Sequence, residues 1–448
     1  MSRTAAASTL VLLLLAPSCA GKPSPYNVLL VTLDTVRADY FSSYGYPRPS
    51  TPHFDRLGMD GVRFELAIAQ AAVTPVSHAS ILTGRNPYSH GVRVLHAAAG
   101  YRLPEDVPYL PEQLRRRGWR TGAFLSAFPV SGRFGFRRGF DHFDSGIDDR
   151  EDAFTRKGDG HFAWRVDANQ RRSDATTDRA LAWLAAGESR FFAWVHYWDP
   201  HDTALLPPPE HLDRFVSPGL EAPDRRRAVY AAELSYVDRQ FGRLMTWLEE
   251  SGRLDDTVVV VVADHGQGLG DHGWWHHRIL YQEQIRVPLL MRWPGEVARP
   301  VVEELVRTID IQPTILDLVA VTPREPGDGR TLRPLVEGRD DELRVAYADQ
   351  LNLYDTNATV VARRPDDALL HCAMDARWKL VYRPLEPQKS TLFDLHADPA
   401  ETRNLYRRGH PEVLRLRRFV RPGLVDGPFG EDTDPEVIER LRALGYLD

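Results

Sequence analysis

The sequence predicts an α/β fold in which a mostly parallel sheet flanked by helices is followed by a small C-terminal antiparallel sheet. Short runs that are apolar on both faces alternate with helical patterns, which is typical of parallel strands buried between helix layers. A chain of 448 residues is too long for one ordinary core, so one large domain and one small domain are expected. From about residue 342 the runs become short and turn-separated, which favours antiparallel strands.

The elements follow from these patterns in chain order. Strands of the large sheet are expected at residues 27–33, 121–125, 191–195, 258–263 and 287–291. Helices are expected between them at residues 111–117, 177–186 and 225–250. The small sheet is expected to use residues 343–348, 368–374, 378–382 and 390–395, before terminal helices at 411–419 and 434–444. These patterns divide the chain into a targeting segment at 1–20, a large domain at 26–340 and a C-terminal subdomain at 341–448.

Composition excludes several classes of protein. Apolar residues make up 43% and charged residues 26%, as in a globular protein. The formal charge of -6 shows no basic excess, so no nucleic-acid partner is expected. Cys19 and Cys372 are the two cysteines, which excludes a disulfide framework and predicts a core position for Cys372.

The first twenty residues predict export. Arg3 precedes an apolar stretch at residues 10–16 that is too short to span a bilayer. Two processing routes fit: residues 18–20 form a small-residue cleavage site, and residues 16–19 form a loose bacterial lipobox whose Cys19 would carry a lipid. The sequence therefore predicts a location in the bacterial periplasm or cell envelope, with membrane contact only through a lipid anchor at Cys19.

Acidic and imidazole side chains follow three of the expected strands. Asp34 ends the first run, Asp264 and His265 end the 258–263 run, and the 191–195 run leads to His196, Asp199 and His201. The carboxyl ends of parallel strands form the ligand-binding edge of an open α/β sheet. A mixed oxygen and nitrogen ligand set favours zinc, manganese or a similar divalent ion over calcium. Each Asp taken alone is equally well explained as a helix N-cap.

Two further segments carry candidate chemistry. In residues 72–85, Thr74 before Pro75 predicts a helix N-cap, and Gly84 predicts the end of that helix. Thr74 would then be only a cap, or its hydroxyl would meet an oxyanion at the helix N-terminus and serve as a metal-activated nucleophile. Residues 263–277 hold four histidines among glycines directly after a buried strand, which favours a functional site.

Together these segments resemble the sulfatase branch of the alkaline phosphatase superfamily. The resemblance rests on residues 31–39, 80–85, 199–201, 264–266 with 286–289, 310–314, and 392–395 with 398–399 and 404–405, in the order of that family. It covers roughly residues 26–405 and implies an alkaline-phosphatase-like fold.

The departures from the sulfatase pattern bear on the chemistry. Thr74, Val76 and His78 stand where sulfatases carry a modifiable Cys or Ser, a Pro or Ala, and an Arg. Threonine cannot become formylglycine, so none is expected. Residues 124–126 and His277 stand where two lysines of sulfatases are expected. The pattern is more similar to relatives with a threonine nucleophile, the phosphodiesterases and phosphoglycerol transferases.

The resemblance implies a set of site residues. One divalent metal ion, with Mn, Zn, Mg and Ca all left open, would be held by Asp34, Thr74, Asp264 and His265. Thr35 replaces a second Asp ligand common in sulfatases. Thr74, His201 and His277 would be catalytic, and the substrate would contact His78, His201 and His277.

The leading hypothesis is a metal-dependent, sulfatase-like hydrolase or transferase acting on sulfate or phosphate esters, with phosphate diesters favoured on chemical grounds. Its anionic ester substrate would be a glycan sulfate, a phosphodiester or a phospholipid head group. One alternative is a two-zinc phosphodiesterase with a second metal set from Asp199, His201 and either His277 or His371. The other is a non-catalytic envelope lipoprotein that binds anions. The metal content per chain would distinguish these three hypotheses, which require one, two and no metal ions respectively.

Overall fold

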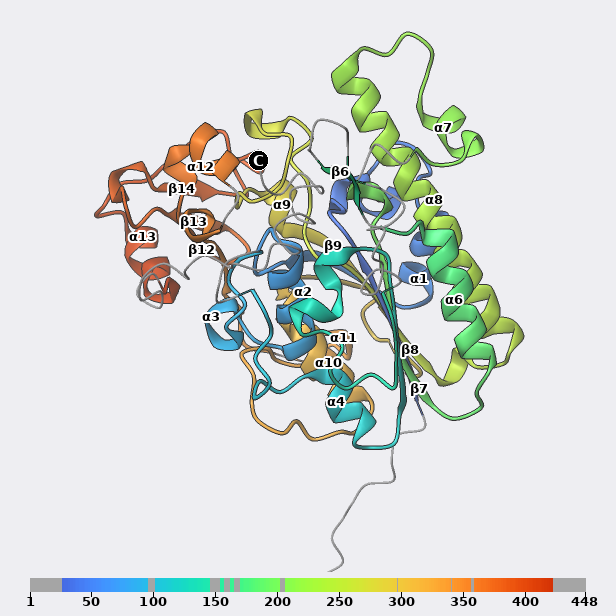
Figure 1. Ribbon diagram of the computed structural model, residues 1–448. Coiled ribbons are helices and arrows are strands. Elements are labelled where there is room, and N and C mark those ends of the chain that lie inside the picture. Colours follow the sequence, from blue (N-terminus) through green and yellow to red (C-terminus); the bar gives the residue numbers. More distant parts are fainter. Residues whose placement is uncertain are drawn as a thin grey trace, which may run out of the picture.

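A large eight-stranded sheet forms the centre of the protein (Figure 1). The computed structural model describes residues 26–95, 101–145, 154–156, 162–164, 170–201, 206–295, 297–339, 341–355 and 358–421. The strand order is β10-β2-β9-β8-β1-β7-β3-β4. The strands are β1 (Asn27–Leu33), β2 (Val62–Ile68), β3 (Arg120–Leu125), β4 (His142–Asp144), β7 (Phe191–Tyr197), β8 (Thr257–Ala263), β9 (Arg286–Arg292) and β10 (Val301–Arg307). A separate pair, β5 (Phe154–Arg156) and β6 (Phe162–Trp164), is antiparallel.

Strand direction in the large sheet is parallel except at β9. β1 pairs in parallel with β7 and β8, whereas β9 is antiparallel to both of its neighbours, β8 and β2. The chain leaves β8, forms a long loop and the short helix α9 (Gln282–Ile285), and enters β9 from the same edge of the sheet. Because no helix crosses back over the sheet between β8 and β9, the two strands run in opposite directions. The loop between them therefore lies at the carboxyl end of β8.

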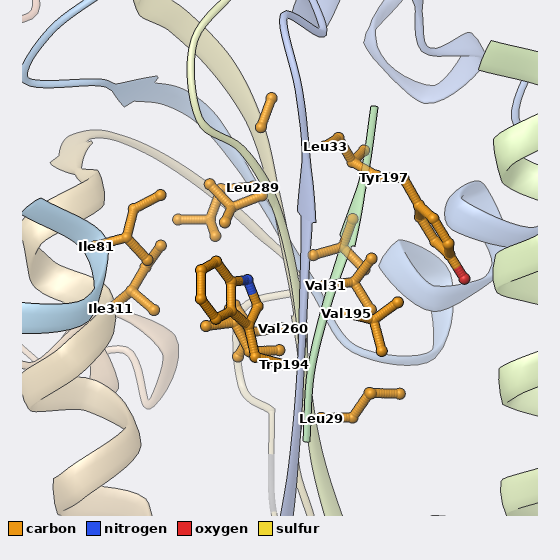
Figure 2. Packing of buried hydrophobic residues seen from close by; sticks show 14 of the residues in the cluster. Leu29, Val31, Leu33, Ile81, Trp194, Val195, Tyr197, Val260, Leu289 and Ile311 are labelled. Atoms are coloured by element: carbon orange, nitrogen blue, oxygen red, sulfur yellow. The ribbon is translucent and has the colours of Figure 1, made fainter. Parts of the chain in front are cut away.

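Helices cover both faces of the large sheet (Figure 1). One face carries α1 (Pro52–Asp60), α6 (Ser173–Ala185) and α8 (Ala222–Glu250), with α7 (Pro209–Phe215) against α8. The other carries α2 (Thr74–Thr83), α4 (Leu110–Arg115), α10 (Ile311–Leu318) and α11 (Arg333–Val336), with α3 (Pro87–His90) beside α2. Figure 2 shows Ile81 of α2 and Ile311 of α10 packed toward Trp194 and Val260 on one face of the sheet. Leu29, Val31 and Val195 point to the opposite face.

The C-terminal part forms its own four-stranded antiparallel sheet. Its strands follow one another as β11 (Ala346–Gln350), β12 (Leu370–Met374), β13 (Trp378–Tyr382) and β14 (Thr391–Asp394), with helices α12 (Ala358–Arg363) and α13 (Pro411–Leu416). Cys372 is buried in β12, as expected, and burial raises the pKa of its thiol to about 12. Among the described residues, no helix has both the length and the apolar character needed to cross a membrane.

The predicted fold class is confirmed, but the sequence patterns did not indicate three strands of the large sheet or the separate pair β5 and β6. All five expected strands of the large sheet are present, but β2, β4 and β10 were not anticipated. β2 alternates apolar residues with Arg63 and Glu65, and β10 contains Glu303 and Glu304, so neither forms a continuous apolar run. The targeting segment at 1–20 and the expected helix at 434–444 lie outside the described residues.

Candidate active site

The carboxyl ends of β1 and β8 place two carboxylates side by side. The backbone N–H of Asp34 donates to the carbonyl of Tyr197 at 2.9 Å, and that of Asp264 donates to the carbonyl of Leu33 at 3.0 Å. These bonds continue the parallel ladders by one residue, so both acids are fixed on the rigid edge of the sheet. Ligand atoms of Asp34, Asp264 and His265 all lie within 4.8 Å of one another, and all three side chains are buried.

The two carboxylates are costly to keep charged at this position. Burial, followed by the charge of Asp264, raises the pKa of Asp34 well above its usual range, and the Thr74 side chain acts in the opposite direction. Burial also raises the pKa of Asp264. Asp34 Oδ1 and Asp264 Oδ2 are buried and accept no hydrogen bond among the described residues. Two buried carboxylate oxygens without donors, next to an imidazole, fit a divalent cation.

The remaining bonds of Asp264 and His265 fix their orientation. Asp264 Oδ1 accepts the backbone N–H groups of Thr35 at 3.0 Å and His265 at 2.6 Å, which leaves Oδ2 to face the cluster. His265 Nδ1 lies 2.9 Å from the Gly266 carbonyl and must donate to it, so the lone pair of the neutral ring is on Nε2. Burial lowers the pKa of His265 to about 3, which keeps this lone pair available to a metal.

Thr74 lies at the start of α2 with its hydroxyl facing the cluster. Its Oγ1 is 3.5 Å from His265 Nε2, and its side chain is close enough to Asp34 to favour the charged form of that carboxylate. The expectation that Thr74 caps this helix is wrong: Val73 is the N-cap, Thr74 is the first helical residue, and its hydroxyl makes no capping bond. The expected end of the helix is confirmed, because Gly84 takes a left-handed conformation with a φ of 64°.

His78 lies beneath Thr74 rather than beside it. Its Nδ1 donates to the Thr74 carbonyl at 2.8 Å, so its Nε2 must accept the Thr32 hydroxyl at 3.1 Å. Thr32 in turn accepts the indole N–H of Trp194 at 2.9 Å. The ring is fully buried, and burial lowers its pKa to about 4. The structure thus gives His78 the geometry of a support for the first turn of α2, and its contact with substrate stays a prediction.

His277 and His201 continue outward from the cluster. His277 Nδ1 donates to the Ala72 carbonyl at 2.8 Å, and its ring centroid lies 4.7 Å from that of His265. The His201 ring is 5.6 Å from that of His277 and stacks on Trp198 at 3.8 Å. Burial lowers the pKa of both rings well below the usual value. The rings of His265, His277 and His201 therefore lead from Thr74 toward the protein surface.

With this geometry in view, the comparison with known families is decisive. Residues 26–321 match the family model described as Sulfatase. This chain belongs to the sulfatase family. Residues 270–418 also match a model described as the C-terminal part of N-sulphoglucosamine sulphohydrolase.

Members of this family and proteins of the same fold match along nearly the whole chain. An arylsulfatase of Clostridium perfringens is 24% identical over 85% of this chain and 90% of its own length. The phosphonate monoester hydrolase of Agrobacterium radiobacter has the same fold, with a TM-score of 0.68, 22% identity and coverage of 88% and 94% of the two chains. A protein solved with its substrate D-glucosamine-2-N,6-O-disulfate gives a TM-score of 0.68 at 19% identity, covering 95% and 98%. This sulfatase-family protein is thus a sulfatase-like ester hydrolase with an alkaline-phosphatase-superfamily fold.

The second metal set of the two-zinc alternative is not brought together in this sulfatase-family protein. Asp199 accepts the backbone N–H and hydroxyl of Ser173 at 3.0–3.2 Å, so it binds the first turn of α6. His371 lies in β12 and bonds to the Tyr347 hydroxyl at 3.0 Å. Within the described ranges, the cluster of Asp34, Asp264 and His265 is the one group of three such residues that could hold a metal ion.

His196 is the neighbour of the cluster to which sequence reasoning gave no role. It lies inside β7 rather than after it, and its Nε2 is 3.3 Å from Asp34 Oδ2. Its position at the second-last residue of a buried strand, level with Thr32 of β1, was the available signal. The ring keeps one oxygen of Asp34 oriented, as the backbone N–H groups do for Asp264. Thr35 has a different role from a ligand, because its hydroxyl donates to the Asp34 carbonyl at 2.8 Å.

Proposed function

We propose that this protein is a metal-dependent hydrolase of phosphate and sulfate esters that uses Thr74 as its nucleophile and prefers phosphate esters, diesters above all. One observation carries the proposal: the Thr74 hydroxyl lies 3.5 Å from His265 Nε2, next to two buried carboxylates whose facing oxygens accept no hydrogen bond among the described residues. Such a group of oxygen and nitrogen atoms fits one divalent cation. Asp34, Thr74, Asp264 and His265 would hold it.

Each residue of the site has a separate role in the proposed reaction. A divalent cation at this position supplies positive charge that lowers the pKa of the Thr74 hydroxyl. Thr74 Oγ attacks phosphorus and the bond to one leaving alcohol breaks, so the threonine carries the phosphoryl group of a monoester, or the phosphoryl group with its second ester still attached in the case of a diester. His277 fixes its own tautomer by donating from Nδ1 to Ala72, so its Nε2 accepts a proton and returns it to the leaving oxygen. Water then attacks phosphorus and gives its proton through His277 to the departing Thr74 Oγ, which releases phosphate from a monoester or a phosphate monoester from a diester.

The single hydroxyl of Thr74 favours phosphate over sulfate. A formylglycine diol expels sulfate through its second oxygen, whereas a sulfated threonine has to be broken by attack of water at sulfur. A phosphorylated threonine is open to in-line attack by water or an alcohol. The residues in place of the two expected lysines point the same way, since a neutral imidazole such as His277 carries less fixed charge than a lysine. The similarity to a phosphonate monoester hydrolase is consistent with this preference.

The test compares Thr74→Ala with Thr74→Ser on bis(4-nitrophenyl) phosphate, 4-nitrophenyl phosphate and 4-nitrophenyl sulfate, with each divalent metal in turn. The serine variant retains a nucleophilic hydroxyl and should retain turnover, whereas the alanine variant should lose it. Intact mass after a rapid quench should show one adduct on the wild type, a phosphoryl group with the monoester and a 4-nitrophenyl phosphoryl group with the diester, and no adduct on Thr74→Ala. Efficient turnover of the sulfate ester with no phosphate diester hydrolysis would overturn the preference and favour a glycan sulfatase. Metal content of one, two or no ions per chain separates this proposal from the two-zinc enzyme and from an anion-binding lipoprotein.

We also propose that the protein is exported and that its mature chain begins at Cys19 with a lipid anchor. The support is a lone cysteine directly after a short apolar stretch. Mass spectrometry of the mature N-terminus decides between a lipidated Cys19 and ordinary cleavage, which would leave an unmodified N-terminus nearby.

A further inference from the structure

Arg226, in the first turns of α8, is a half-buried cation close to the outer end of the histidine series. Helix α8 packs against the short 3-10 helix Asp199–His201 that carries His201, and its N-terminal turns follow α7 at one end of the sheet (Figure 1). After burial and His265, the positive charges of His276, Arg226 and Arg278 further lower the pKa of His201. Arg226 and Arg363 also lower the pKa of His276, for which burial is again the larger cause. The guanidinium of Arg226 therefore lies near both rings.

Arg226 differs from the arginine next to it in having no acidic partner among the described residues. Burial alone lowers its pKa, with no compensating carboxylate. The adjacent Arg227 lies 3.6 Å from both Asp224 and Asp271 and donates to the Leu269 carbonyl at 2.9 Å. The ring of Trp275 supports both guanidinium groups, at 5.0 Å from Arg226 and 5.7 Å from Arg227. A desolvated arginine held over an aromatic ring without a carboxylate is suited to bind an anion from outside the chain.

His276 and Arg363 extend this positive region onto the C-terminal part. Part of His276 is desolvated, but the residue still reaches the surface, whereas His277, the next residue, is buried. Arg363 is an exposed residue in the last turn of α12. Arginines from the large sheet's helix layer and from the C-terminal part thus act on the same imidazole. This positive region is remote from Thr74, because the rings of His265, His277 and His201 lie between the region and the Thr74 hydroxyl.

We propose that Arg226, supported by Trp275 and accompanied by His276 and Arg363, forms a subsite for a second anionic group of the substrate. This inference rests on the proposed function and narrows its substrate class. The ester that reacts at Thr74 belongs to a molecule with another sulfate, phosphate or carboxylate, as in a polyanionic saccharide. Because the subsite is remote from Thr74, it binds the substituent and not the phosphorus or sulfur that reacts.

Calorimetric titration of metal-loaded Thr74→Ala, which the proposed function expects to be inactive, tests the subsite through binding without turnover. The probes are glucose 6-phosphate against glucose 1,6-bisphosphate, and glucosamine 6-sulfate against glucosamine 2-N,6-O-disulfate. Thr74→Ala with no other change should bind the doubly charged member of each pair about tenfold more tightly, the advantage expected of one charge-assisted contact. Adding Arg226→Gln should remove most of that advantage. Adding Arg225→Gln, which removes the same charge from the preceding, exposed position, should retain it.

The two pairs of probes identify the anion that the subsite binds. Tighter binding of the doubly charged member in only the phosphate pair indicates a phosphate site, and in only the sulfate pair a sulfate site. The subsite is refuted if Thr74→Ala shows no preference for a second anion, or if adding Arg225→Gln and adding Arg226→Gln reduce that preference equally, which would indicate a general field effect. If the wild type hydrolysed none of the esters, the proposed function would be refuted, but the measured preference for a second anion would still stand.

Discussion

Asp264 shows how one side chain serves both the fold and the site. Oδ1 accepts two backbone N–H groups, which fixes the turn after β8, while Oδ2 faces Asp34 and His265 and accepts no hydrogen bond among the described residues. The same division applies to His265, where Nδ1 is held by a carbonyl and Nε2 faces inward. In each residue, one side-chain atom is held by a hydrogen bond to the backbone, and this bond fixes the direction in which the second side-chain atom points. The ligand atoms are therefore oriented before a metal binds.

Asp264→Asn separates these two tasks. The amide oxygen retains the bonds to Thr35 and His265, so the fold should survive, but the carboxylate that faces the cluster is lost. We expect elemental analysis to find no bound divalent metal and turnover to be abolished. Wild type should gain thermal stability when metal is added and lose it with a chelator, and the variant should show neither change.

Asp238→Asn is the matched control for this substitution. Asp238 is another buried acid that accepts backbone N–H groups, from His53 and Phe54 at 2.9–3.2 Å, and it lies in α8 away from the cluster. The metal content of Asp238→Asn should equal that of the wild type. Normal metal content and activity in Asp264→Asn would refute the assigned ligand set.

The elements of the fold were predictable where one physical cause dominates. Strands β1, β7 and β8 are apolar on both faces because helices cover the sheet on both sides, and that pattern is visible in sequence. Their topology then brought Asp34 and Asp264 together as expected. The direction of β9 could not be predicted, because an apolar run has the same composition in either direction. Nor could the sequence predict that Arg226 has no acidic partner among the described residues, because the three adjacent arginines at 225–227 differ only in the partners that the fold brings to them.

Helix α2 positions Thr74 at one end and depends on Gly84 at the other. Gly84 has a φ of 64°, and a Cβ there would lie 2.7 Å from Gln312 Oε1 and 3.2 Å from Pro313 Cδ. Gly84→Ala should therefore lower the free energy of unfolding by more than the ~1 kcal/mol of left-handed strain alone. Gly252→Ala is the control, because its φ of 68° is similar and no atom lies within 4 Å of the added Cβ. Urea unfolding measures both, and an equal loss would contradict a steric cost at Gly84.

The loop after β8 is clamped to the C-terminal part by His272. Its Nδ1 is 2.9 Å from Glu283 Oε1 and its Nε2 is 3.1 Å from the Ala400 carbonyl, and both acceptors require an N–H. The ring also stacks on Tyr281 at 3.7 Å. Although burial acts against it, the bond to Glu283 and the charges of Glu283 and Glu401 raise the pKa of His272 above its usual 6.5. The geometry thus favours the doubly protonated imidazolium.

This clamp predicts a pH dependence of stability. Because the folded-state pKa of His272 lies above the unfolded value, its stabilisation is fully present below pH 6.5 and is lost as the pH rises through the folded pKa. The difference in free energy of unfolding between wild type and His272→Gln should therefore shrink as urea titrations move from pH 6 to higher values. His276→Gln is the control, since burial and arginine charges lower the pKa of His276 instead. A difference that grows with pH would contradict the imidazolium.

At the scale of the whole molecule, buried ion pairs connect the large sheet with the C-terminal sheet. Arg93 follows α3 and donates from Nη2 to Asp349 Oδ2 of β11 at 2.6 Å, with side-chain exposures of 4% and 0%. The Tyr347 hydroxyl donates to the same oxygen at 2.8 Å and accepts from His371 Nδ1 at 3.0 Å. Arg278, next to His277, binds Asp355 at 2.8 Å in the same region. The C-terminal part is therefore joined to the segment that carries the site histidines.

Removing one partner of the Arg93–Asp349 pair should lower the free energy of unfolding by more than the pair itself contributes, because the other charge stays buried. Arg93→Met leaves the Asp349 carboxylate buried without its cation, which typically costs about 3–5 kcal/mol of unfolding free energy. Adding Asp349→Asn removes the uncompensated charge but retains an acceptor for Tyr347, so the double variant should recover most of that loss. Lys389→Met, which breaks exposed pairs with Asp366 and Glu386, should change stability little. Equal urea midpoints for Arg93→Met and Lys389→Met would show that this buried pair does not join the two sheets.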